Sequence, residues 1–164
     1  MNKAVAIHGL ATFVLSAAVV SAAAEPGHYR RKAESGQEAV VGVGVRYNKA
    51  CQGTGVPEVS LDAAPEHGFV CARIGPVRPR NLIFGSGKHC FHKMMTGLQI
   101  VYQSRLDFSG MDAVGYTLKF PRGNRALVVD IQVKPVVGAA SKQANPLFER
   151  QPTGRMPDCV ALVS

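Results

Sequence analysis

The second half of the chain alternates large apolar residues with polar or small residues over three stretches. The apolar positions are Leu98, Ile100 and Tyr102, then Val114, Tyr116, Leu118 and Phe120, and finally Leu127, Val129, Ile131 and Val133. A period of two is typical of a β-strand with one buried face. Because only the short segment PRGN separates the last two stretches, they predict a β-hairpin.

Weaker strand patterns precede these three stretches. In residues 39–47 valines alternate with Gly42 and Gly44, and glycines on one face of a strand indicate an edge or the close approach of a neighbour. A second strand contains Pro57, which restricts it to an edge, and residues 64–74 predict a turn followed by a third strand. The mature chain shows no helical period, so we predict an all-β fold in which two antiparallel sheets form a sandwich.

The two ends of the chain differ from this strand-rich region, which we place at residues 39–134. Residues 1–24 combine an apolar run with small residues at a cleavage site, and they predict a cleaved secretory signal peptide, with a retained anchor as the alternative. Residues 25–38 are polar and basic without an apolar period, so we expect a flexible leader. Residues 135–164 are rich in Pro, Gly and Ala and predict a tail that is pinned near its end by Cys159.

The net charge bears on the choice of partner. The formal charge of +8 falls to +7 when Lys3 is lost with the signal peptide. This charge favours anionic surfaces such as phospholipid or polysaccharide, and it also keeps a small protein in solution. Trp is absent and aromatic and basic residues are not interleaved, so we do not expect nucleic-acid binding. The expected partner is an unknown protein or an anionic envelope component, without stable membrane insertion after signal cleavage.

All four cysteines, Cys51, Cys71, Cys90 and Cys159, lie in the predicted mature chain. An even number in an exported protein predicts two disulfides, for which three connectivities are possible. The sequence does not decide among them, and we take Cys51–Cys90 with Cys71–Cys159 as the working hypothesis. Zinc binding would require closely spaced cysteine pairs, which are absent.

Two segments, PEHGFV and GLQIVYQSRLDFSGMDAVGYTL, together resemble a motif of bacterial Ig-like, cadherin-like modules of secreted and surface proteins. The matching residues are Pro65, His67, Gly68, Val70, Gly97, Val101, Tyr102, Phe108, Gly110, Asp112 and Tyr116. The departures are Ser104 in place of Pro, Asp107 in place of Gly and Val114 in place of Phe. The resemblance implies a two-sheet antiparallel sandwich with an adhesive, assembly or spacer role rather than catalysis.

The residues Phe108, Gly110, Asp112 and Tyr116 also have a direct physical interpretation as a structural corner that leads into a strand. Glycine allows backbone angles that are closed to other residues, and an aspartate can accept N–H groups of its own turn. The two rings would then be buried in one core, with the tyrosine hydroxyl needing a partner. The alternative, calcium binding by Asp112, would require more converging carboxylates than the sequence supplies.

The segment HCFHKMM places imidazole and thioether donors close together, and such soft ligands suit copper. A copper site would use His89, His92 and Met94. However, residues three apart on an extended strand face opposite sides, so the two histidines could converge only on a turn. A structural role for this segment is the favoured interpretation.

Catalytic patterns are weak in this sequence. Cys90 directly follows His89 without the glycine that peptidoglycan transpeptidases place between them, and no serine lies in a nucleophile elbow. We therefore expect no enzyme activity and no cofactor. The predicted function is a non-catalytic binding or structural module in the periplasm or outside the cell, and a periplasmic copper-binding protein is the alternative.

Overall fold

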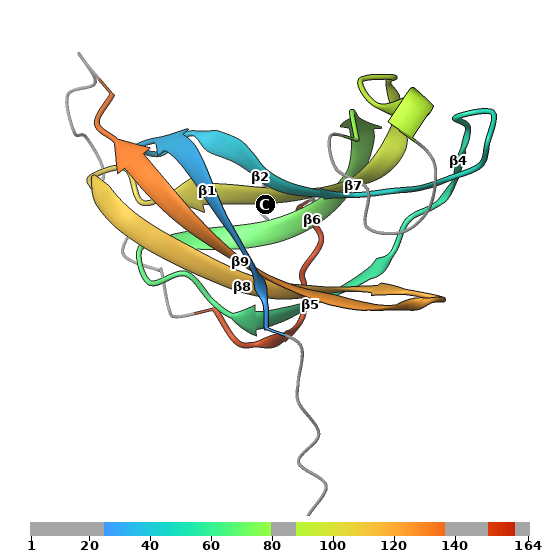
Figure 1. Ribbon diagram of the computed structural model, residues 1–164. Helices are drawn as coiled ribbons and strands as arrows, with labels where there is room; N and C mark the ends of the chain where they lie inside the picture. The colour runs from blue at the N-terminus through green and yellow to red at the C-terminus, as the bar shows by residue number, and fades with distance from the viewer. Residues whose placement is uncertain (1–24, 80–87, 137–150, 160–164) are drawn as a thin grey trace, which may run out of the picture.

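The computed structural model describes residues 25–79, 88–136 and 151–159 (Figure 1). The regular structure of these residues consists of β-strands and one short 3-10 helix, which confirms the all-β prediction. The strands are β1 (Gly27–Glu34), β2 (Glu38–Gly44), β3 (Arg46–Tyr47), β4 (Gly53–Gly55), β5 (Glu58–Ala63), β6 (Gly68–Val77), β7 (Met95–Ser104), β8 (Gly110–Phe120), β9 (Gly123–Lys134) and β10 (Gly154–Arg155), and the helix is η1 (Lys88–Cys90). The predicted signal peptide, residues 1–24, lies outside the described residues.

Two sheets of unequal width face each other across one hydrophobic core (Figure 1). The wider sheet has the strand order β1-β9-β8-β5-β10, and the narrower sheet has the order β2-β7-β6. Strands β3 and β4 form a separate hairpin. Both larger sheets contribute to the core, for example through Ile100 of β7 and Ile131 of β9, which are fully buried.

The alternating positions of the sequence fill this core. The even-numbered apolar residues of β7 and β8 and the odd-numbered apolar residues of β9 are buried, apart from the half-buried Phe120 at the end of β8. Strands β8 and β9 pair antiparallel from Gly110 opposite Val133 to Phe120 opposite Gly123, so the predicted hairpin is present. The periodicity therefore located the inward faces of the strands correctly.

The prediction of a flexible leader at residues 25–38 is wrong. Most of this segment is β1, which pairs in parallel with β9 from Gly27 opposite Leu127 to Glu34 opposite Lys134. The expectation of an entirely antiparallel sandwich is corrected at the same point. The sequence pattern missed β1 because it is an edge strand with many charged residues, in which Ala33 is the one fully buried side chain.

The end of the tail, residues 151–159, is integrated into the fold more extensively than a single cysteine link requires. β10 pairs with β5, and Met156 is buried in the main core. The side-chain amide of Gln151 donates to the carbonyl of Val70 at 2.8 Å and accepts the amide N–H of the same residue at 3.0 Å. The rest of the predicted tail, apart from residues 135 and 136, lies outside the described residues.

Two disulfides join segments that are distant in the sequence, and their pairing confirms the working hypothesis. Cys51 is bonded to Cys90, and Cys71 of β6 is bonded to Cys159. The bonded residues are 39 and 88 positions apart. In the chain-entropy model, loops of these lengths stabilise the folded state by roughly 4 kcal/mol each.

The corner before β8 is built around the buried carboxylate of Asp112. Its oxygens accept the backbone N–H groups of Glu66 at 2.9 Å and His67 at 3.0 Å, and the hydroxyl of Tyr102 at 2.8 Å. Within its own strand Asp112 accepts only the N–H group of Ala113. The carboxylate thus connects β8 to β7 and to the loop before β6, rather than closing only its own turn as the sequence predicted.

The other corner residues have separate roles. Gly110 begins β8 at a φ of 146°, a conformation that side chains disfavour. The ring of Phe108 stacks on the imidazole of His67 with a centroid separation of 4.1 Å, at the margin of the core. Tyr116 is buried farther along β8. Burial raises the pKa of Tyr102, as does the hydrogen bond to Asp112, so this hydroxyl remains a donor.

We expect Asp112→Ala to lower the free energy of unfolding by about 3–5 kcal/mol, because several buried donors lose one shared acceptor. Tyr102→Phe serves as the matched control, since it removes one of these hydrogen bonds and leaves the carboxylate paired; we expect a cost of about 1–2 kcal/mol. Urea unfolding at pH 7 measures both values. Equal costs for the two variants would contradict the central role of Asp112.

Candidate ligand-binding cleft

A cavity of about 1060 Å³ opens between the two sheets at the end that carries the β3–β4 hairpin. Its lining comes from β1, β8 and β9 of the wider sheet, from β2, β6 and β7 of the narrower sheet, from β3, β4 and the segment between them, and from η1. In Figure 1 the β8–β9 hairpin and the segment leading to β4 extend away from the rest of the fold on this side. Small-molecule sites in proteins span roughly 300–1,000 Å³, so this cleft has room for a whole ligand.

The floor of the cleft is the hydrophobic core itself. Val41 of β2, Leu118 of β8 and Val129 of β9 line the cavity, belong to the main core, and are almost fully buried. A β-bulge between Val40 and Gly42 interrupts the pairing of β2 with β7 at this point. Bulges redirect side chains, and here the consecutive residues from Val40 to Val43 all line the cavity.

Two tyrosine hydroxyls in the cleft have no hydrogen-bond partner among the described residues. The hydroxyl oxygen of Tyr47 is buried and unpaired, and Tyr116 is only 2% exposed without a partner for its hydroxyl. Burial raises the pKa of Tyr116 to about 12, with Tyr29 adding to the rise and Arg31 and Arg125 opposing it. Because a buried polar group without a partner is costly, the Tyr47 hydroxyl is available to a polar group of a ligand, and the unpaired Tyr116 hydroxyl belongs to the same lining.

Gly42 explains how Tyr116 fits beneath β2. A Cβ atom at this position would overlap the Tyr116 hydroxyl and approach the Cβ atom of Ile100. The glycine therefore permits the close approach of Tyr116. Close approach of a neighbour was one of the two explanations that the sequence pattern offered for glycines on one face of this strand. β2 is also an edge strand of its sheet, so both interpretations of the glycine pattern apply.

The rim of the cleft is cationic. Six basic residues line it: Arg31, Arg46, Lys49, Arg78, Arg122 and Arg125. No Asp or Glu of the described ranges lines the cleft, and none of these six side chains forms an ion pair there. Uncompensated charge of one sign around an apolar cavity raises the local concentration of anions.

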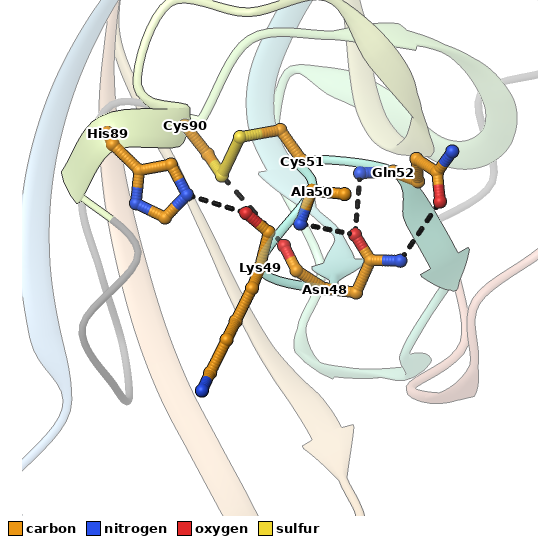
Figure 2. The surroundings of a disulfide bond; sticks show 7 residues. All are labelled: Asn48, Lys49, Ala50, Cys51, Gln52, His89 and Cys90. Carbon is orange, nitrogen blue, oxygen red and sulfur yellow. Dashed lines mark hydrogen bonds between the residues drawn. A yellow bond between two sulfur atoms is a disulfide. The ribbon is translucent and has the colours of Figure 1, made fainter.

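The disulfide Cys51–Cys90 supports the wall of the cleft (Figure 2). The side-chain oxygen of Asn48 accepts the N–H groups of Ala50 and Gln52, each at 3.0 Å, and closes the turn before the cysteine. The Nε2 atom of His89 lies 2.7 Å from the carbonyl oxygen of Lys49. The disulfide and these hydrogen bonds fix the backbone of Lys49 at the rim.

The structure gives the proposed copper ligands different environments. His89 contacts the backbone of Lys49, whereas the exposed His92 has a left-handed backbone with a φ of 65°. The sulfur of Met94 accepts a hydrogen bond from the guanidinium of Arg78 at 2.8 Å, which places a cation beside it. His89 also lies within 4.8 Å of the sulfur atoms of Cys51 and Cys90, but these sulfurs are bonded to each other and are not thiolate ligands. This arrangement does not favour the copper alternative.

Sequence reasoning missed most of the cleft. It assigned Tyr116 to the corner and the core, and it treated Arg31 as part of a loose leader. The one sequence feature that pointed to the cleft was the alternation of Gly42 and Gly44 with valines. No sequence signal placed Arg125 beside β1, because the two strands are almost 100 residues apart and pair in parallel.

Comparison with known proteins identifies no family. No protein-family model matches the sequence, and no curated protein matches it. The solution structure of Amebosin aligns with 67% of this chain and 100% of its own length, at 12% identity and a TM-score of 0.32. Similarity at this level carries no argument about fold or function.

Tyr116→Phe tests the environment of the buried hydroxyl. Unfolded tyrosines ionise near pH 10, whereas folded Tyr116 keeps its proton to about pH 12, so the unfolded state binds fewer protons in this interval and stability falls as the pH rises. We expect the loss of unfolding free energy between pH 9 and pH 11 to be about 1 kcal/mol smaller in the variant. Urea unfolding at both pH values measures this difference, and identical losses would contradict it.

Proposed function

We propose that this protein is an exported, non-catalytic binding module of the bacterial envelope, periplasmic or secreted, and that its ligand occupies the cleft between its two sheets. The observation that supports this proposal most directly is the hydroxyl oxygen of Tyr47, which is buried in the lining of a cavity of about 1060 Å³ and has no hydrogen-bond partner among the described residues. A protein tolerates a buried, unsatisfied group chiefly where function requires it.

The disulfides and the sequence pattern support export and an Ig-like scaffold. Two disulfides indicate an oxidising compartment outside the cytoplasm, in agreement with the signal peptide predicted at residues 1–24. The described residues contain no helix that is long and apolar enough to cross a membrane. The Ig-like assignment rests on the motif residues, in particular Gly110 and Asp112, and the parallel pairing of β1 is its main departure from the expected pattern.

The residues lining the cleft favour binding over catalysis. Apart from Tyr29, Tyr47 and Tyr116, its titratable groups among the described residues are the six rim cations and His89, whose Nε2 atom is engaged by a backbone carbonyl. Arginine is always protonated and cannot act as a general base. All four cysteines are in disulfides, so none is available as a nucleophile.

The neutral apolar dye N-phenyl-1-naphthylamine tests whether the cleft is a binding site. We expect saturable, one-to-one fluorescence enhancement, because an apolar floor beneath a wide opening transfers the dye out of water. Val43→Trp should weaken binding at least tenfold by filling the cleft, since Val43 lines it and is 38% exposed.

Ile74→Trp provides the matched control. Ile74 is an exposed apolar strand residue on β6 that does not line the cleft, so this variant should bind the dye like the unaltered protein. Thermal unfolding establishes that both variants are folded. Enhancement that fails to saturate, or that is equally reduced in both variants, would overturn the proposed function.

A further inference from the structure

Two arginines occupy the inward face of the wider sheet, where the neighbouring positions are core residues. On β1, Tyr29, Arg31 and Ala33 share one face by their alternation, and Ala33 is buried in the main core. On β9, Arg125 lies opposite Leu118 of β8, which is fully buried. Both guanidiniums line the cleft. Arg31 is exposed and Arg125 is half-buried, so it is Arg125 that loses hydration beside the apolar core, which is costly unless an opposite charge compensates for it.

The ring of Tyr29 lies beside both guanidiniums. The central carbon atoms of Arg31 and Arg125 lie 5.8 and 5.9 Å from the centroid of its ring. Arg125 donates one hydrogen bond to the Tyr29 hydroxyl at 2.5 Å, and Arg31 donates one to the carbonyl of Arg30 at 2.9 Å. A guanidinium has five N–H donors, so most donors of both arginines remain free for an anion.

The apolar floor begins directly beside these cations. Leu127 and Val129 follow Arg125 on the same face of β9, and Val41 of β2 lines the opposite wall. The cleft therefore combines an anion-binding edge with apolar lining residues, among which Val43 is exposed and Phe120 is half-buried. Neither a small inorganic anion nor an uncharged hydrocarbon would use both parts of it.

We propose that the cleft binds a single-chain amphiphile with an anionic head group. The head, a carboxylate or a phosphate, lies between Arg31 and Arg125 within reach of the Tyr116 hydroxyl, and the chain lies along the accessible apolar lining residues Val43 and Phe120. This assignment rests on the proposed function and specifies its ligand. A volume of about 1060 Å³ accommodates one such molecule.

Displacement of N-phenyl-1-naphthylamine by monomeric amphiphiles tests the assignment. At pH 7.5 we expect dodecanoate or dodecyl phosphate to displace the dye at concentrations at least tenfold lower than 1-dodecanol, because charge-assisted hydrogen bonds bind the head. The comparison of carboxylate with phosphate identifies the preferred head group. Decanoate, which is two methylenes shorter, should bind about fifteenfold more weakly than dodecanoate, since each methylene buried contributes about fourfold.

Paired substitutions separate the arginine site from the general charge of the protein. The double variant Arg31→Gln/Arg125→Gln should bind dodecanoate at least tenfold more weakly, while its affinity for the neutral dye changes less than twofold. The control Arg30→Gln/Lys32→Gln removes the same charge from the same edge of the sheet, but neither residue lines the cleft. This control should keep the affinity for dodecanoate within twofold.

Each other outcome contradicts a specific claim. Saturable dye binding without a preference for dodecanoate over dodecanol would overturn the amphiphile assignment and leave the proposed function intact. An equal loss in both double variants would show a diffuse field instead of a site, and it would also overturn the assignment. Binding to anionic phosphatidylglycerol vesicles without binding to monomeric dodecanoate would identify a surface interaction instead. Absence of saturable dye binding would overturn both proposals.

Discussion

The structure depends on a mismatch between two sheets that must share one core. An amphipathic sheet is stable in water only when its apolar face is covered, and the inner face of the five-stranded sheet is wider than the three-stranded sheet opposite. β5 and β10 lie toward one side of the wider sheet, and β9 and β1 lie toward the other. On the latter side the cleft is lined partly by core residues, including Leu127 and Val129, both of which remain buried.

Polar and covalent links add to the apolar contacts of the core and hold the two sheets in this arrangement. The carboxylate of Asp112 connects β8 of one sheet with β7 of the other through Tyr102, at a site where water is excluded. The disulfide Cys71–Cys159 attaches the C-terminal segment to β6, and that segment adds β10 to the wider sheet. Both links lie away from the residues of the cleft, so the fold does not require the cleft itself to be filled. A scaffold of this kind satisfies the need of a binding protein for a preformed site.

The chemistry of the cleft is consistent with its position in an exported protein. Its rim cations have no acidic partner among the described residues, and its floor is aliphatic. Gly42 and Tyr116 indicate that the cleft is more than a gap left by incomplete packing. The glycine makes room for the Tyr116 hydroxyl, which has no hydrogen-bond partner in the described structure. The cleft thus presents an anion-attracting rim, two unpaired tyrosine hydroxyls and apolar lining residues to the same ligand.

The sequence by itself determined the strand faces, the all-β class and the presence of enough cysteines for two disulfides, because side-chain alternation along a strand is a local property. It also located the importance of Gly110 and Asp112, although it assigned the hydrogen bonds of Asp112 to the wrong segment. Only the tertiary structure decided that residues 27–34 form an edge strand, since its stability comes from backbone pairing with β9 and little from buried side chains. The cleft was likewise decided by tertiary structure, because Arg31, Gly42 and Arg125 become neighbours only when the two sheets stack and the wider sheet remains partly uncovered.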